Sequence, residues 1–138
     1  MLLSVLGSVC DSERERGVMQ DYKELVVWQK SIELVKNIYT LCKVLPKEET
    51  YSLSDQIRRC VVSIPSNIAK RSGRNTTREF IQFLYISLGS ACEVETQLII
   101  RKEIGYFSNV SNYYNINEIK KMINGLINSL KNKDRNAN

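Results

Sequence analysis

The sequence predicts an all-α protein, an up-down-up-down antiparallel four-helix bundle that assembles as a homo-oligomer. Four segments carry apolar residues at the three- and four-residue spacings of amphipathic helices, and short polar connections separate them. No segment shows the apolar–polar alternation that is typical of β-strands. One of the four helices has two adjacent apolar stripes where a monomeric bundle needs one, which predicts packing against a second subunit.

Length and composition are those of a single globular domain. The chain has 138 residues, of which 43% are hydrophobic and 25% charged, and this suffices for a buried core. We expect a disordered N-terminal extension over residues 1–18, the bundle over 19–132 and a frayed tail over 133–138. No apolar run approaches the ~18 residues that cross a bilayer. Since no Lys or Arg precedes the apolar residues 1–10, secretion is not expected either, and a cytoplasmic protein is predicted.

The first helix is predicted over residues 25–42, and it ends before Pro46 because the residue preceding a proline resists the helical conformation. Its apolar stripe consists of Leu25, Trp28, Ile32, Val35, Tyr39 and Cys42. The second helix is predicted to begin at Ser52 or Ser54, either of which could cap it, and to end at Gly73. Its stripe consists of Ile57, Cys60 or Val61, Ile64 and Ile68. Because this stripe continues past Pro65, we expect a kink or local break at that proline and not an end.

The third helix is predicted over residues 77–103, capped by Thr76 or Thr77 and closed by Gly105. One stripe consists of Phe80, Leu84, Leu88 or Ser87, Ala91, Val94 and Leu98. A second stripe beside it consists of Ile81, Tyr85, Cys92 and Ile99. The last helix carries Ile116, Ile119, Ile123, Leu126 and Leu130 at heptad spacing, and a basic tail follows Leu130.

Nothing in the chain indicates catalysis or a metal site. There is no histidine, no phosphate-binding glycine loop and no nucleophile elbow. The four cysteines are widely spaced, which argues against a zinc site and against a disulfide framework. Cys42, Cys60 and Cys92 each fall on an apolar stripe and are predicted to lie in the core. We therefore expect a protein that is not an enzyme and needs neither cofactor nor metal.

Basic residues are concentrated in one part of the chain. Residues 53–78 contain six cations against the single acidic residue Asp55, a net charge of +5 that equals the formal net charge of the whole protein. These cations are Arg58, Arg59, Lys70, Arg71, Arg74 and Arg78. Local positive charge indicates a polyanionic partner, and guanidinium groups beside turn hydroxyls suit phosphate contacts. Two interpretations stay open: a surface that binds the RNA or DNA backbone, or a solvated helical face.

Three residues are predicted to have structural roles: Pro65, Asn67 and Glu93. If the second and third helices are antiparallel around a turn near residue 75, Arg59 lies level with Glu93. This predicts an interhelical ion pair that fixes the register of the bundle, and the alternative is two exposed charges on separate faces. The Asn67 amide is predicted to satisfy a backbone group that Pro65 frees, with ligand binding as the alternative.

Several motifs, in order along the chain, resemble a known family. They are Leu25-Val-Val-Trp-Gln-Lys30, Leu53-Ser-Asp-Gln-Ile-Arg-Arg59, Ser63-Ile-Pro-Ser-Asn-Ile-Ala69 and Phe83-Leu-Tyr-Ile-Ser-Leu-Gly-Ser90, followed by Glu93 and Gln97-Leu98. Over residues 20–130 the chain is similar to the four-helix-bundle family of 23S rRNA intervening-sequence proteins. These are small bacterial proteins whose reading frames can lie inside insertions in large-subunit rRNA genes. The resemblance implies a four-helix bundle, usually a homopentamer, with no established enzymatic activity.

The resemblance also bears on partners. Related bundles that accompany diversity-generating retroelements bind nucleic acid and a reverse transcriptase, which by analogy implies contact with RNA or DNA. The chain departs from the family at Lys70-Arg71, where Glu-Gly is usual, and in starting before Met19. We expect a non-catalytic oligomer that binds RNA or DNA backbone through the six cations, with no membrane and no small-molecule substrate. The alternative is a protein-interaction scaffold that binds no nucleic acid.

Overall fold

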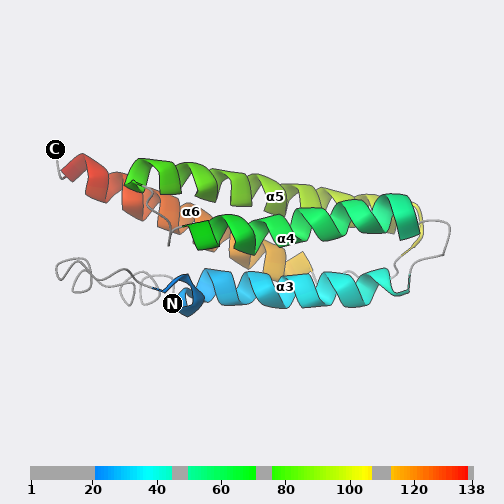
Figure 1. Cartoon of the computed structure of the whole chain (residues 1–138). Coiled ribbons are helices and arrows are strands. Elements are labelled where there is room, and N and C mark those ends of the chain that lie inside the picture. The colour runs from blue at the N-terminus through cyan, green and yellow to red at the C-terminus, as the bar shows by residue number, and fades with distance from the viewer. Residues whose placement is uncertain (1–20, 45–49, 71–75, 107–112, 137–138) are drawn as a thin grey trace.

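The computed structural model describes residues 21–44, 50–70, 76–106 and 113–136. Within these ranges the protein is all-α and has no strand, as predicted. Its four helices are α3 (Val26–Cys42), α4 (Asp55–Ala69), α5 (Thr77–Glu103) and α6 (Tyr113–Asn136). A 3-10 turn, η1 (Tyr22–Glu24), precedes α3, and a π-helical turn, η3 (Thr50–Ser54), precedes α4. The helices lie side by side and pack against one another along one long axis (Figure 1).

The ends of α5 follow from local chemistry, and its predicted bounds are those of the structure. The Thr76 side chain accepts a hydrogen bond from the backbone N–H of Glu79 at 3.2 Å, and the Glu79 carboxylate lies where it complements the helix dipole. At the other end Gly105 adopts a φ of 89°, a conformation that glycine tolerates without steric cost. The N–H of Gly105 donates to the carbonyl of Lys102 and completes the helix end.

Helix α4 passes through Pro65 without ending, as its continuous apolar stripe predicts, and the local break offered as an alternative to a kink is wrong because the helix is continuous from Asp55 to Ala69. It ends at Ala69, however, before the predicted Gly73, which lies outside the described residues. At its start the Ser54 side chain makes no capping hydrogen bond, so the predicted serine cap at this position is wrong. The π-helical turn η3 already satisfies part of the role of a cap, because it leads continuously into α4.

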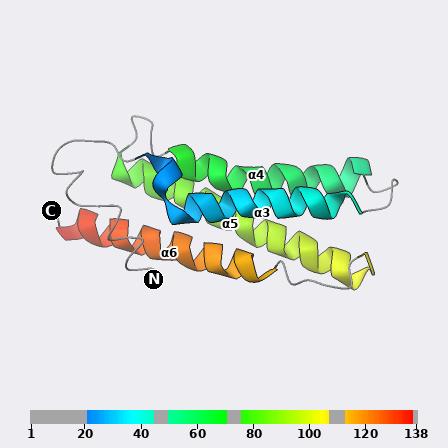
Figure 2. The same ribbon diagram turned by 90° about the horizontal axis from the view of Figure 1, so that it is seen from below.

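One apolar core runs through the bundle, and all four helices contribute to it. The predicted stripe of α6 is buried: Ile116, Ile119, Ile123, Leu126 and Leu130. The predicted stripe of α4 is buried: Ile57, Cys60, Val61, Ile64 and Ile68. The first predicted stripe of α5 is buried: Phe80, Leu84, Ser87, Ala91, Val94 and Leu98. Helix α4 packs against both α3 and α5, and α6 packs against the same two helices from the other side of the bundle (Figure 2).

The predicted stripe of α3 is correct at its two ends, where Leu25 and Cys42 are buried, and wrong by one position between them. Its core residues are Val27, Ser31, Leu34, Ile38 and Cys42. Trp28, Ile32 and Val35 are only half-buried, and Tyr39 is 42% exposed. Both series have helical spacing, so periodicity alone could not choose between them. The true series is interrupted by Ser31, whose hydroxyl donates to the Trp28 carbonyl at 2.6 Å and so enters the core without an unsatisfied donor.

Most of the second predicted stripe of α5 is not covered by the described residues. Ile81 is buried, whereas Tyr85 is 45% and Ile99 46% exposed. Cys92 is also exposed, which corrects the prediction that it lies in the core, while Cys42 and Cys60 are buried as predicted. Cys92 belongs to an apolar series, but at this position the series faces away from the core.

Candidate nucleic-acid interface

The structure separates the predicted basic residues into two groups. Arg58 and Arg59 lie near the start of α4, Lys70 follows its last residue, and Arg78 lies in the first turn of α5. At ~1.5 Å per residue, Arg59 and Lys70 are roughly 16 Å apart along the helix. Lys70 and Arg78 thus lie at the same end of the bundle, on either side of residues 71–75 (Figure 1). Arg71 and Arg74 lie outside the described residues.

Arg58 turns toward α3 and away from its neighbour Arg59. Its guanidinium carbon lies 5.5 Å from the centroid of the Tyr39 ring, within the range of a cation–π contact. Its Nε is buried and has no hydrogen-bond partner among the described residues. Part of the Arg58 side chain therefore packs on the α3–α4 side of the bundle, and the rest faces solvent.

The predicted ion pair between Arg59 and Glu93 is wrong. Arg59 instead pairs with Asp55, one turn earlier on α4, at 3.0 Å. Glu93 accepts a hydrogen bond from the side chain of Gln97 at 3.4 Å. The two residues do lie at the same height along the bundle, as predicted, since both line one shallow groove between α4 and α5. Because the Arg59 side chain is 81% exposed, its pair with Asp55 contributes little to stability and leaves the cation accessible to a phosphate.

Lys70 and Arg78 are both exposed. The ammonium group of Lys70 lies 4.7 Å from the centroid of the Phe83 ring, so an aromatic face holds it against α5. Arg78 lines a shallow depression together with Thr76, Thr77 and Asp134. Hydroxyl groups and a guanidinium beside the start of a helix are the chemistry of phosphate contacts, although Asp134 lowers the local positive charge.

Asn67 forms hydrogen bonds within α4. Its amide nitrogen donates to the carbonyl of Ser63 at 2.8 Å and to the Ser63 hydroxyl at 3.0 Å. The carbonyl that Pro65 leaves without its helical donor belongs to Val61, four residues before the proline. The predicted partner was therefore wrong, although the amide does bond a backbone carbonyl.

With this geometry in place, comparison with known proteins is informative. The family model described as 23S rRNA-intervening sequence protein matches residues 23–125, from η1 into α6. The chain belongs to this family. The resemblance read from the motifs is thereby confirmed. A search of curated proteins finds no match to the chain.

The 23S rRNA-intervening sequence proteins are not a known enzyme family, and the polar residues between α4 and α5 here are mutually bonded. Ser90 donates to the Ser63 hydroxyl at 2.9 Å, Ser87 to the Ile64 carbonyl at 2.8 Å, and the Cys60 thiol to the Ser90 carbonyl at 3.3 Å. Burial, together with the Glu93 carboxylate, raises the pKa of Cys60 to about 12. A thiol that stays protonated is a poor nucleophile and a poor metal ligand. Among the described residues, no cluster of His, Cys, Asp or Glu could hold a metal ion.

Sequence reasoning missed Arg101, a fully buried cation in the last turns of α5. It is 1% exposed, and it donates to the Gln97 carbonyl at 3.0 Å, to the Gln97 side-chain oxygen at 3.3 Å and to the Leu53 carbonyl. The bond to Leu53 ties η3 to α5 in this family member. A signal was available, because Arg101 follows Leu98 by three residues and so continues the buried stripe of α5.

Among the described helices, α5 is long and apolar enough to cross a membrane by length and composition alone. The same helix supplies one side of the bundle core, with Leu84, Ala91 and Val94 fully buried against its neighbours. Its remaining apolar residues therefore belong to a second, outward-facing side.

Proposed function

We propose that this protein is a non-catalytic, homo-oligomeric helical bundle of the cytoplasm that binds RNA or DNA through the phosphate backbone. The observation that carries the proposal is the concentration of charge at one end of the bundle. Residues 70–78 hold Lys70, Arg71, Arg74 and Arg78 and no acidic residue. Lys70 and Arg78, the two of these that the structure describes, are exposed. Exposed cations close together release counterions when they contact phosphates, which drives sequence-independent binding.

The assembly we propose is an up-down-up-down bundle that forms a homopentamer. Short connections between helices that pack as chain neighbours support the antiparallel arrangement, because a short connection returns the chain beside the helix it leaves. The outward apolar residues of α5 support an oligomer, since a monomer rarely leaves such a face in water. The number five comes from the family alone.

Salt titration of binding tests the nucleic-acid proposal. A variant with Lys70, Arg71 and Arg74 changed to alanine is compared with the native protein by fluorescence anisotropy on a labelled generic RNA. Each lost phosphate contact reduces the slope of log affinity against log salt by about 0.7 to 0.9, so the triple variant should lose roughly two units of slope on every RNA sequence tested.

The matched control removes the same charge elsewhere, by changing the exposed Lys23, Lys36 and Lys43 to alanine. This control should keep most of the native slope. A triple variant whose slope equals that of the native protein would place the site elsewhere, and the basic end of α6 would be examined next. Absence of binding by the native protein at low salt would end the nucleic-acid proposal.

A protein-interaction scaffold is the second candidate function. The exposed isoleucines of α5 favour it, because apolar residues contribute little to binding of a phosphate backbone and much to binding of another protein. This candidate predicts that the oligomer forms normally while the native protein fails to bind heparin or RNA at low salt.

A further inference from the structure

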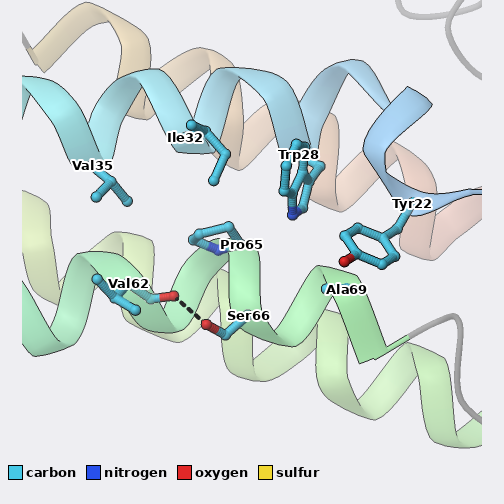
Figure 3. Close-up of a pocket in the computed structure, with 8 residues that line it drawn as sticks. All are labelled: Tyr22, Trp28, Ile32, Val35, Val62, Pro65, Ser66 and Ala69. Atoms are coloured by element: carbon cyan, nitrogen blue, oxygen red, sulfur yellow. Dashed lines mark hydrogen bonds between the residues drawn. The ribbon is translucent and has the colours of Figure 1, made fainter.

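Two outward apolar surfaces of different shape remain on this subunit. The first, the α5 ridge, consists of Tyr85, Ile86, Cys92, Ile99, Ile100 and Ile104. The second, the α3–α4 groove, is lined by Trp28, Ile32, Val35, Val62, Pro65 and Ala69, with Tyr22 and Ser66 at its edges (Figure 3). One surface is the convex side of a single helix, and the other is a depression between two helices.

The groove exists because α3 has two apolar series, of which only one is fully buried. Helix α3 buries the series that includes Leu34 and Ile38, so its second apolar series, with Trp28 and Ile32, is left along the edge that faces α4. Figure 3 shows these α3 side chains and Pro65 pointing toward one another across the gap. Val62, on the α4 wall, is 39% exposed. An apolar depression of this kind is a site for an apolar occupant.

The ridge has the complementary composition. Ile86 is 50% and Ile100 49% exposed, and between them α5 presents the small residues Gly89 and Cys92. A side chain added at Gly89 would meet nothing within 4 Å, so the middle of the ridge is open to a close approach by another surface. Glu93 is the one acidic residue among the exposed positions of α5 from Tyr85 to Ile100.

We propose that the α5 ridge of one subunit seats in the α3–α4 groove of the next subunit, so that copies pair head to tail through two different surfaces. This inference rests on the proposed homo-oligomer and specifies how its subunits meet. The arrangement covers both apolar surfaces of every copy with one type of contact. A like-to-like pairing of two ridges would leave Trp28, Val35 and Val62 in water.

Charge supports the same pairing. Arg58 lies on the groove side of α4, over Tyr39, with a buried Nε that has no partner among the described residues. The ridge brings the exposed Glu93, whose carboxylate contacts Gln97 at 3.4 Å and the Cys60 thiol but forms no ion pair with the described residues. Ridge against groove brings a cation and an anion to the same interface, whereas ridge against ridge brings two Glu93 carboxylates together.

The pairing is compatible with the proposed homopentamer. Helix α4 packs between α3 and α5, so the groove lies on one side of α4 and the ridge lies beyond its other side. A contact between two unlike surfaces rotates each copy relative to the last, and the copies form a ring when that rotation closes. In such a ring Arg58 is an interface residue and no longer part of the nucleic-acid surface.

A mixing experiment tests the pairing. Ile99→Asp disables the ridge and leaves the groove intact, while Val62→Asp disables the groove and leaves the ridge intact. Each variant alone should be monomeric by light scattering. Mixed in equal amounts they should form a dimer and nothing larger. In each mixed pair the intact ridge of the Val62→Asp variant can bind the intact groove of the Ile99→Asp variant, and no other intact surface remains. Asn128→Asp, which adds the same charge at an exposed position of α6, is the matched control and should assemble like the native protein.

Each outcome has one meaning. Circular dichroism checks that the variants are folded, and Ile99→Ser with Val62→Ser repeats the test with milder changes if either aspartate variant is not. A mixture that stays monomeric, or a Val62 variant that assembles fully on its own, overturns the pairing while the oligomer stands. A native protein of 15.9 kDa by light scattering overturns the oligomer itself, and the pairing with it.

Discussion

Helices α5 and α6 pack against each other and have similar lengths, but the residues at their exposed positions differ. The buried residues of α6 include Ile116, Ile119 and Ile123, and its exposed positions carry asparagine and lysine, such as Asn124, Asn128 and Lys121. The exposed positions of α5, in contrast, include four large apolar residues between residues 85 and 100, namely Tyr85, Ile86, Ile99 and Ile100. Helix α6 thus buries its apolar residues within the bundle, whereas α5 has one apolar side in the core and a second apolar side that the described residues leave exposed.

The comparison extends to α3, which has the same doubled pattern as α5. Its inner series forms core, and its second series lines the α3–α4 groove. The exposed apolar residues of α3 and those of α5 do not contact each other, because α4 lies between the two helices. The exposed apolar residues of α3 and those of α5 can therefore contact different copies, which is the physical basis of the head-to-tail pairing that we propose.

The largest effect is expected from the inner side of α6. Ile123 is fully buried, so Ile123→Ala should lower the free energy of unfolding by about 2–5 kcal/mol through lost burial and the cavity left behind. Urea unfolding measures this change. The matched control, Asn124→Ala on the adjacent outer position, should stay within about 0.5 kcal/mol of the native protein. Equal effects at the two positions would contradict the division of α6 into a core side and a solvent side.

The inner sides of α4, α5 and α6 could be predicted from the sequence for a simple reason. Each has one apolar series that accounts for its buried residues, and hydrophobic burial selects it whatever the neighbours are. In α3 two series compete, and Ser31 weakens the one that is buried. The choice between them depends on how closely α3 approaches α4 and α6, which is a property of the tertiary packing.

The candidate site, like α3, could be predicted only in part from the sequence. The cluster of cations is visible in the sequence, but the direction in which each points is set by neighbours distant in the chain or one turn away. Tyr39 draws Arg58 to one side of α4, and Asp55 holds Arg59 on another. Arg101 was missed because a charged residue in an apolar series is ordinarily exposed, and hydrogen bonds to the carbonyls of Leu53 and Gln97 help to make its burial possible.

A smaller effect is expected from Arg101, which sharpens the comparison because it is the one buried cation on the inner side of α5 among the described residues. Changing Arg101 to alanine leaves the Leu53 carbonyl without this donor and should lower the free energy of unfolding by about 1–3 kcal/mol. Lys102→Ala, at the exposed neighbouring position, is the control. If the two variants unfold at the same urea concentration, the tie between η3 and α5 does not stabilise the fold.

The smallest effect is expected at Cys60, on the polar edge where α4 meets α5. Burial and the Glu93 carboxylate raise the pKa of the thiol from 9.0 to about 12 in the folded protein. Because the folded pKa is above the unfolded value, the stability linked to the neutral thiol is fully present below pH 9 and is lost as pH rises toward 12. At pH 10 the loss amounts to about 1.4 kcal/mol, since one pH unit above the unfolded pKa corresponds to that free energy.

The measurement compares urea unfolding at pH 7.5 and pH 10 for the native protein and for Cys60→Ala. Other groups titrate in the same range, but they are common to both proteins and cancel in the difference. The native protein should therefore lose about 1.4 kcal/mol more than the variant between the two pH values. Cys92→Ala, at the exposed cysteine of the α5 ridge, should follow the native protein. An identical loss in native protein and Cys60→Ala would mean that the α4–α5 edge admits water to the thiol, so that the pKa of Cys60 is not raised in the folded protein.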